Sequence, residues 1–200
     1  MYWDLAMRTH SKSFIIFGTV VLSFWIWSCD RREPERIVSL VINEFMAVND
    51  SVLTDEYGDF DDWIELYNTA EDTIFLSGYS LTDNYDLPEK YTFADTAYIV
   101  PYGYMLLWAD NEPTEGRLHT SFKLSGEGER IGLFDDLGTR IDFIEFPMQS
   151  PDMSYGRYPN GSDTLMYFGL CEDCITLDCE TNCSGINPTP GGSNDGFIFR

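Results

Sequence analysis

Short apolar runs separated by polar turns make up most of this chain, and the clearest run spans residues 63–68. In that run Ile64 and Leu66 fall on one face, while Trp63 and Tyr67 fall on the other. A repeat of two residues is typical of a pleated strand whose two faces meet different surroundings. The pattern therefore predicts a strand over residues 63–68, directly after an acidic segment.

The same pattern continues to residue 168, with turn residues between the runs. Gly138 ends an Asp-Asp-Leu-Gly sequence that predicts a hairpin turn, and the glycine of Pro-Tyr-Gly at 101–103 is expected to supply a positive φ. The sequence shows no sustained helical periodicity, so it predicts an all-β fold, an antiparallel β-sandwich. The further predicted strands are residues 38–45, 74–76, 79–82, 91–93, 97–100, 104–108, 121–124, 130–134, 140–146, 154–158 and 165–168.

The first 28 residues differ from the rest and predict an export signal. Arg8 and Lys12 precede a mainly apolar run from Phe14 to Trp27. A basic start followed by an apolar stretch of this length is typical of a secretory signal peptide. A membrane-spanning helix needs about 20 apolar residues, so an uncleaved anchor is the less favoured alternative.

Residues 26–29, Ile-Trp-Ser-Cys, resemble the lipobox of bacterial lipoproteins, although Trp27 replaces the small residue usual at its position. The resemblance implies that Cys29 is lipidated and becomes the new N-terminus. A charged linker over residues 29–37 would follow. We therefore expect an exported, membrane-anchored protein on the periplasmic or cell-surface side of the bacterial outer membrane, held to the membrane through its N-terminal lipid.

The charge of the chain argues against nucleic-acid partners. Twelve basic and 34 acidic residues give a net charge of −22, and removal of the predicted leader changes it to −23. Binding to nucleic acid generally needs a cluster of Lys and Arg that neutralises phosphates. Here these residues are few and scattered, so no nucleic acid is expected as a partner.

Several blocks occur in the order and at the spacing of one family, and together they resemble the bacterial lamin tail domain. The blocks are VINEFMA at 41–47, DWIELYN at 62–68, LSGYSLTD at 76–83, YTF at 91–93, IVP at 99–101, GYMLLWA at 103–109, LHTSFKLS at 118–125, IGLFD at 131–135, SYGRYPNG at 154–161 and PTPGGSN at 188–194.

This resemblance implies an immunoglobulin-like β-sandwich over residues 38–194, with a short tail at 195–200. No catalytic residues are assigned to the family, so a non-enzymatic protein is expected. A cysteine-rich segment at 171–183 departs from the family pattern, which usually runs directly into the Pro-Thr-Pro-Gly ending.

Four cysteines lie in that segment, and their spacing permits two structural interpretations. An exported chain meets oxidising conditions, and no basic residue nearby favours thiolates, so two disulfides are expected. A zinc site with four thiolates is the alternative. The sequence does not choose among the three possible pairings of Cys171, Cys174, Cys179 and Cys183.

The acidic loop before residue 63 is the best candidate for ligand chemistry. Its carboxylates surround Gly58 and could supply the hard oxygen ligands that calcium prefers. The spacing is not that of an EF-hand, and in so acidic a chain a solvated turn is the competing interpretation. The candidate calcium ligands are Asp55, Asp59, Asp61 and Asp62; no other cofactor is expected.

Glu65 lies between apolar neighbours and invites a catalytic interpretation, which would need a second carboxylate or a histidine nearby. His119, the only histidine after the leader, has neighbours that suggest packing. A hydrogen-bonded structural role is therefore favoured for both. The expected function is a binding or adhesion module for an envelope protein or glycan, with exposed Tyr and Trp side chains as contacts. An accessory docking subunit for an exported hydrolase or envelope assembly is the alternative.

Overall fold

The structure, a computed structural model, describes residues 39–169 and 190–191. The predicted leader, Cys29 and the four cysteines of the 171–183 segment lie outside these residues. In these residues the regular secondary structure consists of β-strands. No helix among them is long and apolar enough to cross a membrane. The strands are β1 (Leu40–Met46), β2 (Trp63–Asn68), β3 (Ile74–Phe75), β4 (Ser80–Thr82), β5 (Tyr91–Thr92), β6 (Tyr98–Ile99), β7 (Tyr104–Trp108), β8 (Glu129–Phe134), β9 (Arg140–Phe146), β10 (Ser154–Arg157) and β11 (Leu165–Phe168).

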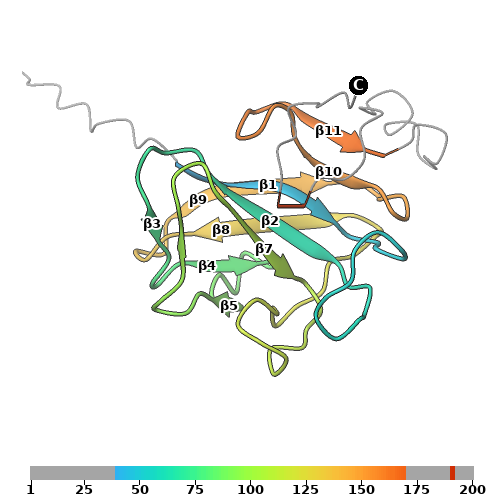
Figure 1. The fold of residues 1–200 in the computed structure, drawn as a ribbon, viewed down its shortest axis with the longest axis horizontal. Coiled ribbons are helices and arrows are strands. Elements are labelled where there is room, and N and C mark those ends of the chain that lie inside the picture. The colour runs from blue at the N-terminus through green and yellow to red at the C-terminus, as the bar shows by residue number, and fades with distance from the viewer. Residues whose placement is uncertain (1–38, 170–189, 192–200) are drawn as a thin grey trace, which may run out of the picture. The chain divides into compact units, whose positions relative to one another are not determined.

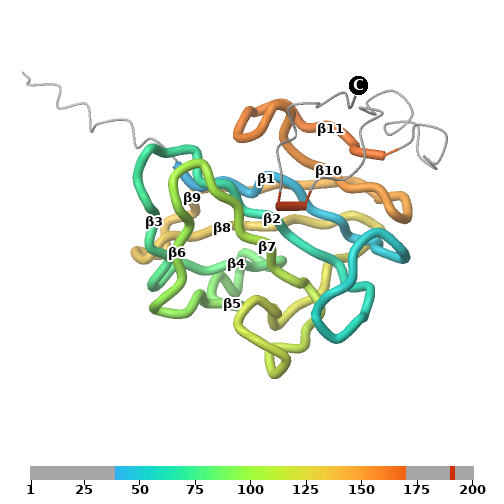
Figure 2. Tube along the Cα trace, in the orientation of Figure 1, coloured from blue at the N-terminus to red at the C-terminus, as the bar shows by residue number. Residues whose placement is uncertain are grey.

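The strands form two main sheets, which Figure 1 shows, and a separate two-stranded pair, whose strands are labelled in Figure 2. The larger sheet has the order β11-β10-β1-β2-β7, and the second has the order β5-β4-β8-β9. The third element is the pair β3-β6. All of these strand pairs are antiparallel. The prediction of an immunoglobulin-like antiparallel β-sandwich is confirmed.

The alternating pattern of β2 places its two faces in two separate apolar clusters. Ile64 and Leu66 are fully buried in the main core between the sheets. Trp63, on the opposite face, packs in a second cluster with Met46 and Trp108. Since burial of apolar area is the main favourable term in folding, β2 contributes to the packing on both faces of the larger sheet.

A β-bulge in β1 determines which side chains of that strand enter the core. Ile42 pairs with Leu66 and Glu44 pairs with Glu65, so Asn43 is an extra residue on the bulged strand. The inward-facing series therefore continues at Phe45 rather than at Glu44.

The predicted strand at 121–124 was wrong, although Phe122 and Leu124 are buried. Local hydrogen bonds compete with a ladder there: the Thr120 hydroxyl donates to the Phe122 carbonyl oxygen at 2.8 Å. The other predicted strands are present, with ends that shift by one or two residues.

The turn at 101–103 forms in an unexpected way. Tyr102 has the positive φ, 55°, that we expected of the glycine. Gly103 is needed for close packing instead, because a Cβ atom there would lie 2.7 Å from Val100 Cγ2. At the other predicted turn, Gly138 does have a positive φ, 71°, and closes the β8–β9 hairpin.

Candidate functional site

Two long loops lie side by side at one end of the sandwich, as Figure 2 shows in teal and yellow-green. One connects β1 to β2 and contains the acidic segment; the other connects β7 to β8. The Tyr57 hydroxyl donates to the Glu115 carbonyl oxygen at 2.9 Å and joins them. Residues that are about 60 positions apart in sequence therefore meet here.

Asp55 organises the first loop from a buried position. Its Oδ1 accepts hydrogen bonds from the backbone N–H groups of Tyr57, Gly58 and Asp59 at 2.8, 2.8 and 2.9 Å. Gly58 has a φ of +92°, which a residue with a side chain rarely adopts, so it allows the tight turn around this carboxylate. Asp55 Oδ2 is buried and has no hydrogen-bond partner among the described residues.

His119 lies at the base of the second loop and is only 1% exposed. Backbone hydrogen bonds position His119, because Leu118 and Thr120 on either side both hydrogen-bond to the backbone of Trp108 in the edge strand β7. Its Nδ1 makes a short hydrogen bond with Oδ2 of Asp110, which is itself fully buried. This contact fixes the orientation of the imidazole ring.

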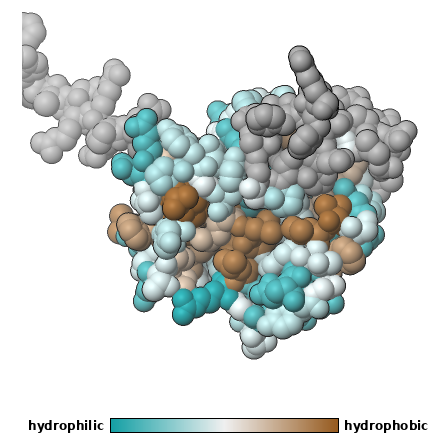
Figure 3. Space-filling view, in the orientation of Figure 1, coloured by the Kyte–Doolittle hydropathy of each residue, from teal (hydrophilic) through white to brown (hydrophobic). Residues whose placement is uncertain are grey.

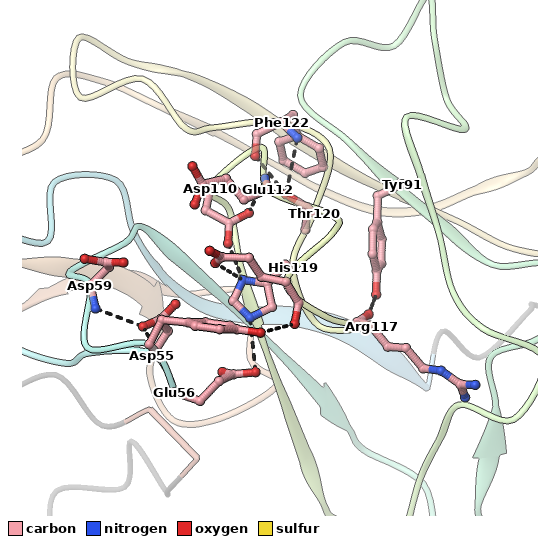
Figure 4. A network of polar contacts seen from close by, with 12 residues as sticks. Asp55, Glu56, Asp59, Tyr91, Asp110, Glu112, Arg117, His119, Thr120 and Phe122 are labelled. Atoms are coloured by element: carbon pink, nitrogen blue, oxygen red, sulfur yellow. Dashed lines mark hydrogen bonds and ion pairs between the residues drawn. The ribbon is translucent and has the colours of Figure 1, made fainter.

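Further carboxylates approach the same ring from both loops, as Figure 4 shows. Glu115 Oε2 lies 3.7 Å from Nδ1, and Glu56 Oε1 lies 3.3 Å from Nε2. Burial would lower the pKa of the His119 imidazole, but contacts with Asp110 and Glu56 outweigh it and raise that pKa. One potential ligand atom from each of Asp55, Glu115 and His119 lies within 4.8 Å of the others.

Of the four aspartates proposed as calcium ligands, only one lies in a group of potential metal ligands among the described residues. Asp55 alone belongs to the group of three just described. The Asp59 side chain points away from His119 (Figure 4). Asp62 Oδ1 accepts a long hydrogen bond, 3.4 Å, from the backbone N–H of Asn49. The oxygen ligands of a single calcium ion would have to converge, and these four do not share one such group in the described residues.

Burial changes the acidity of the two aspartates nearest to β2. It raises the pKa of the Asp62 carboxyl to about 6, although the Asn49 N–H and the Lys123 ammonium act in the opposite direction. The pKa of Asp61 is also raised, first by burial and then by the nearby Asp110 carboxylate. The first loop thus carries acids that hold a proton more readily than free aspartate does.

Sequence reasoning did not find two members of this cluster, Asp110 and Glu115. They occur in Asp-Asn-Glu-Pro-Thr-Glu-Gly, a stretch that lies outside the predicted strands. The spacing of four residues between Glu115 and His119 was the available signal, because the two side chains do meet in the structure. His119 is buried as expected, but carboxylates rather than apolar groups surround its polar atoms.

Two adjoining hollows lie beside the histidine loop. One, about 310 Å³, is mainly apolar, with Phe93, Tyr98 and Met105 in its lining. The other, about 530 Å³, reaches His119 and Lys90. The two share Tyr91, Ala94 and Arg117.

Apolar side chains form a band across one face of the molecule (Figure 3). Tyr98 is 54% exposed and Phe75, whose ring centroid lies 6.3 Å away, is 69% exposed. Trp63 and Trp108 are buried instead, so the expectation that tryptophan would be available for contacts was wrong for these two residues. The exposed tyrosine Tyr98 remains available for contacts with a partner.

Glu65 lies away from this end of the molecule and is fully buried. Its Oε1 accepts a hydrogen bond from Asn43 Nδ2 at 2.8 Å, and its Oε2 accepts one from the Gly191 N–H. His119 contacts Asp110 rather than Glu65. Glu65 therefore holds the closing Pro-Gly segment against β2, a structural role.

Two antiparallel sheets around one apolar core, with long loops at one end, define an immunoglobulin-like β-sandwich module. The model of the lamin tail domain matches residues 34–147, which is more than half of the chain. The protein therefore belongs to the lamin tail domain family, and the resemblance noted in the sequence is confirmed. Members of this family are immunoglobulin-like binding modules rather than enzymes. A search of the curated proteins found no match.

Proposed function

We propose that this protein is a non-catalytic binding module, anchored by a lipid on Cys29 to the bacterial cell envelope, where it holds a protein partner. The observation that carries the proposal is the pair of adjoining hollows beside β7. Binding sites are typically concave and mainly apolar, with a few polar groups that fix orientation. The apolar hollow and the polar groups of Lys90 and Arg117 have this character.

The surface around the hollows supports a protein partner more than a glycan. Tyr98, Val100 and Leu118 are each about half exposed, at 54%, 52% and 45%. Exposed apolar groups that lie together are typical of protein interfaces, in which aromatic residues contribute most of the affinity. The same surface would serve the alternative role, an accessory subunit that docks an exported hydrolase or an envelope assembly.

The experiment is affinity capture from envelope extract with the chain lacking its leader, followed by mass spectrometry and a binding titration with each captured protein. Tyr98→Ala should weaken binding of the true partner by about tenfold or more, because truncation of an aromatic hot spot costs about 2 kcal/mol. The matched control is Leu137→Ala, which removes a side chain of the β8–β9 turn that is 81% exposed and lines neither hollow.

Equal binding by wild type and Tyr98→Ala would contradict the proposed surface. A glycan array run in parallel tests the other ligand class, and retention of glycans without any protein partner would replace the proposal with carbohydrate binding. The anchor is tested separately: Cys29→Ser should move the protein from the membrane fraction to the soluble fraction, and the intact mass of the wild type should include acyl chains.

A further inference from the structure

The cluster around His119 has more negative than positive groups. Asp55, Glu56, Asp110 and Glu115 all approach a single imidazole. The Arg117 guanidinium does not compensate them, because it donates to Thr96 Oγ1 at 3.0 Å and extends away from the ring (Figure 4). Asp55 and Asp110 are buried, and buried carboxylates normally pair with a cation or coordinate a metal ion.

Unsatisfied polar atoms in the cluster point to a missing partner. Asp55 is 8% exposed and His119 is 1% exposed. Among the described residues, Asp55 Oδ2 and Glu115 Oε2 are buried and make no hydrogen bond. His119 Nε2 is also buried and faces the Glu56 carboxylate, 3.3 Å away. A buried polar atom of this kind requires an explanation, and an ion is one of the few available.

We propose that Asp55, Glu115 and His119 bind a divalent transition-metal ion, of which Mn²⁺ and Zn²⁺ are the representative cases. The donors are two carboxylates and one imidazole nitrogen, a mixed set that suits these ions. Calcium is disfavoured because it takes six to eight oxygen ligands and no nitrogen. The proposal does not depend on the partner-binding function, because it concerns the loop ends and not the apolar hollow.

The geometry needs only a small closure. Donor atoms around a metal ion at about 2.1 Å lie roughly 3–4 Å apart, whereas the three ligand atoms lie within 4.8 Å of one another. Glu115 can move inward because its side chain is 24% exposed. Asp110, held against the histidine ring, acts as the carboxylate that orients a metal-binding imidazole.

Access to the ion is provided by the larger hollow, which reaches His119 and Gly116. A Cβ atom at Gly116 would lie 3.3 Å from His119 Cδ2, so the absence of a side chain keeps this approach open. Three protein ligands leave a coordination position for water or for a donor group of a ligand. The ion would also join the β1–β2 loop to the β7–β8 loop.

The test is a Mn²⁺ titration of the full chain after EDTA treatment, followed by electron paramagnetic resonance, which distinguishes bound from free Mn²⁺. Mn²⁺ is the chosen probe because thiolates bind it poorly, so the four cysteines of the 171–183 segment do not interfere. We expect one Mn²⁺ bound per chain. Glu115→Gln and His119→Gln should each weaken binding by about tenfold or more.

The matched control is Asp59→Asn, which changes a carboxylate of the same loop that points away from the cluster. It should bind Mn²⁺ as the wild type does. Thermal melts of all variants without metal check folding, and Mn²⁺ should raise the Tm of the wild type but not of Glu115→Gln. Since Glu115 is partly exposed, this variant tests the proposal even if His119→Gln does not fold.

Two results would overturn the proposal. One is the absence of Mn²⁺ binding by the wild type, which would mean that a proton on His119 alone balances the carboxylates. The other is binding that Glu115→Gln leaves unchanged. In this second case, competition by calcium and loss of binding in Asp59→Asn would place the ion in the acidic loop rather than in this cluster.

Discussion

Glu65 is a carboxylic acid without exposed surface in the middle of β2. Burial raises its pKa to about 8; the hydrogen bond from Asn43 opposes this change, and the neighbouring Glu44 carboxylate adds to it. In the unfolded chain the same group releases its proton near its ordinary pKa of 4.5. Between these two values the folded protein binds more protons than the unfolded chain. The stabilisation is therefore complete below about pH 4.5 and is lost as the pH rises towards about 8.

We expect the Tm of the wild type to fall between about pH 5 and about pH 8, and the fall to be smaller in Glu65→Gln. Glutamine retains an acceptor for Asn43 but has no proton to lose, and each unit of pKa change corresponds to about 1.4 kcal/mol. Thermal melts across this pH range provide the measurement. Burial raises the pKa of Glu129 to about 7 as well, so some pH dependence should remain in the variant.

The control for this prediction is Glu71→Gln, a change in an exposed residue of the turn after β2. It should preserve the wild-type dependence of Tm on pH. An equally steep dependence in Glu65→Gln would show that Glu65 does not retain its proton in the folded protein.

The candidate metal site was only partly predictable from the sequence. Asp55 was found because the acidic loop is a local feature of the chain. Glu115 and Asp110 were not, because their importance arises from a contact between loops about 60 residues apart, which no local pattern encodes. The spacing of four residues between Glu115 and His119 was visible in the sequence. It indicates a site only when the hydrogen bond from Tyr57 to Glu115 brings the two loops together.

The β1 bulge explains why the Ser-Tyr-Gly-Arg block of β10 requires its glycine. Gly156 pairs with Glu44 directly beside the bulge. A Cβ atom at position 156 would lie 2.4 Å from the Asn43 carbonyl oxygen and 2.7 Å from Glu44 Cα. Both are backbone atoms in a strand that is paired on both sides, so neither can move without disturbing the larger sheet.

Gly156→Ala should therefore lower the free energy of unfolding by about 1–3 kcal/mol or more, the usual cost of overpacking. Urea denaturation monitored by tryptophan fluorescence would measure this change. Gly138→Asn is the control, because the turn at 138 has open space around it and asparagine tolerates a positive φ. Equal stability of Gly156→Ala and wild type would mean that the bulge can relax.

Strand positions were largely predictable because a period of two residues and turn residues are local signals. The exceptions have local physical causes too. Residues 121–124 have the right alternation, but the Thr120 hydroxyl donates to the Phe122 carbonyl oxygen two residues further on. The bulge at Asn43 was not predictable, since its sequence, Ile-Asn-Glu-Phe, reads equally well as a regular strand.

A clamp of charged groups ties the two sheets of the molecule together. Arg157 of β10 contacts both carboxylate oxygens of Asp142 of β9 at 2.8 and 3.0 Å. The same two side chains hold the backbone of Ile42, through Arg157 Nε to its carbonyl oxygen at 2.9 Å and its N–H to Asp142 Oδ2 at 2.7 Å. Both side chains are about nine-tenths buried.

Arg157→Met should destabilise the protein by about 3–5 kcal/mol, because removal of one partner leaves a buried carboxylate without its counter-charge. The double variant Asp142→Leu with Arg157→Met should cost less than the sum of the single changes, since no buried charge remains. Urea denaturation of the three variants gives the coupling energy. A double variant whose loss of stability equals the sum of the two single losses would show that Arg157 and Asp142 do not stabilise each other.

The high net charge of the chain, −22, acts on the whole molecule. Carboxylates repel one another over the folded surface more strongly than in the expanded unfolded chain, so self-repulsion lowers stability. Raising the salt concentration from about 0.01 M to about 0.1 M shortens the screening length from about 30 Å to about 10 Å. We therefore expect the Tm to rise over this range in sodium chloride, and to rise equally in tetramethylammonium chloride, whose bulky cation does not coordinate carboxylates. A rise with sodium alone would indicate specific cation binding, and no rise with either salt would contradict a destabilising self-repulsion.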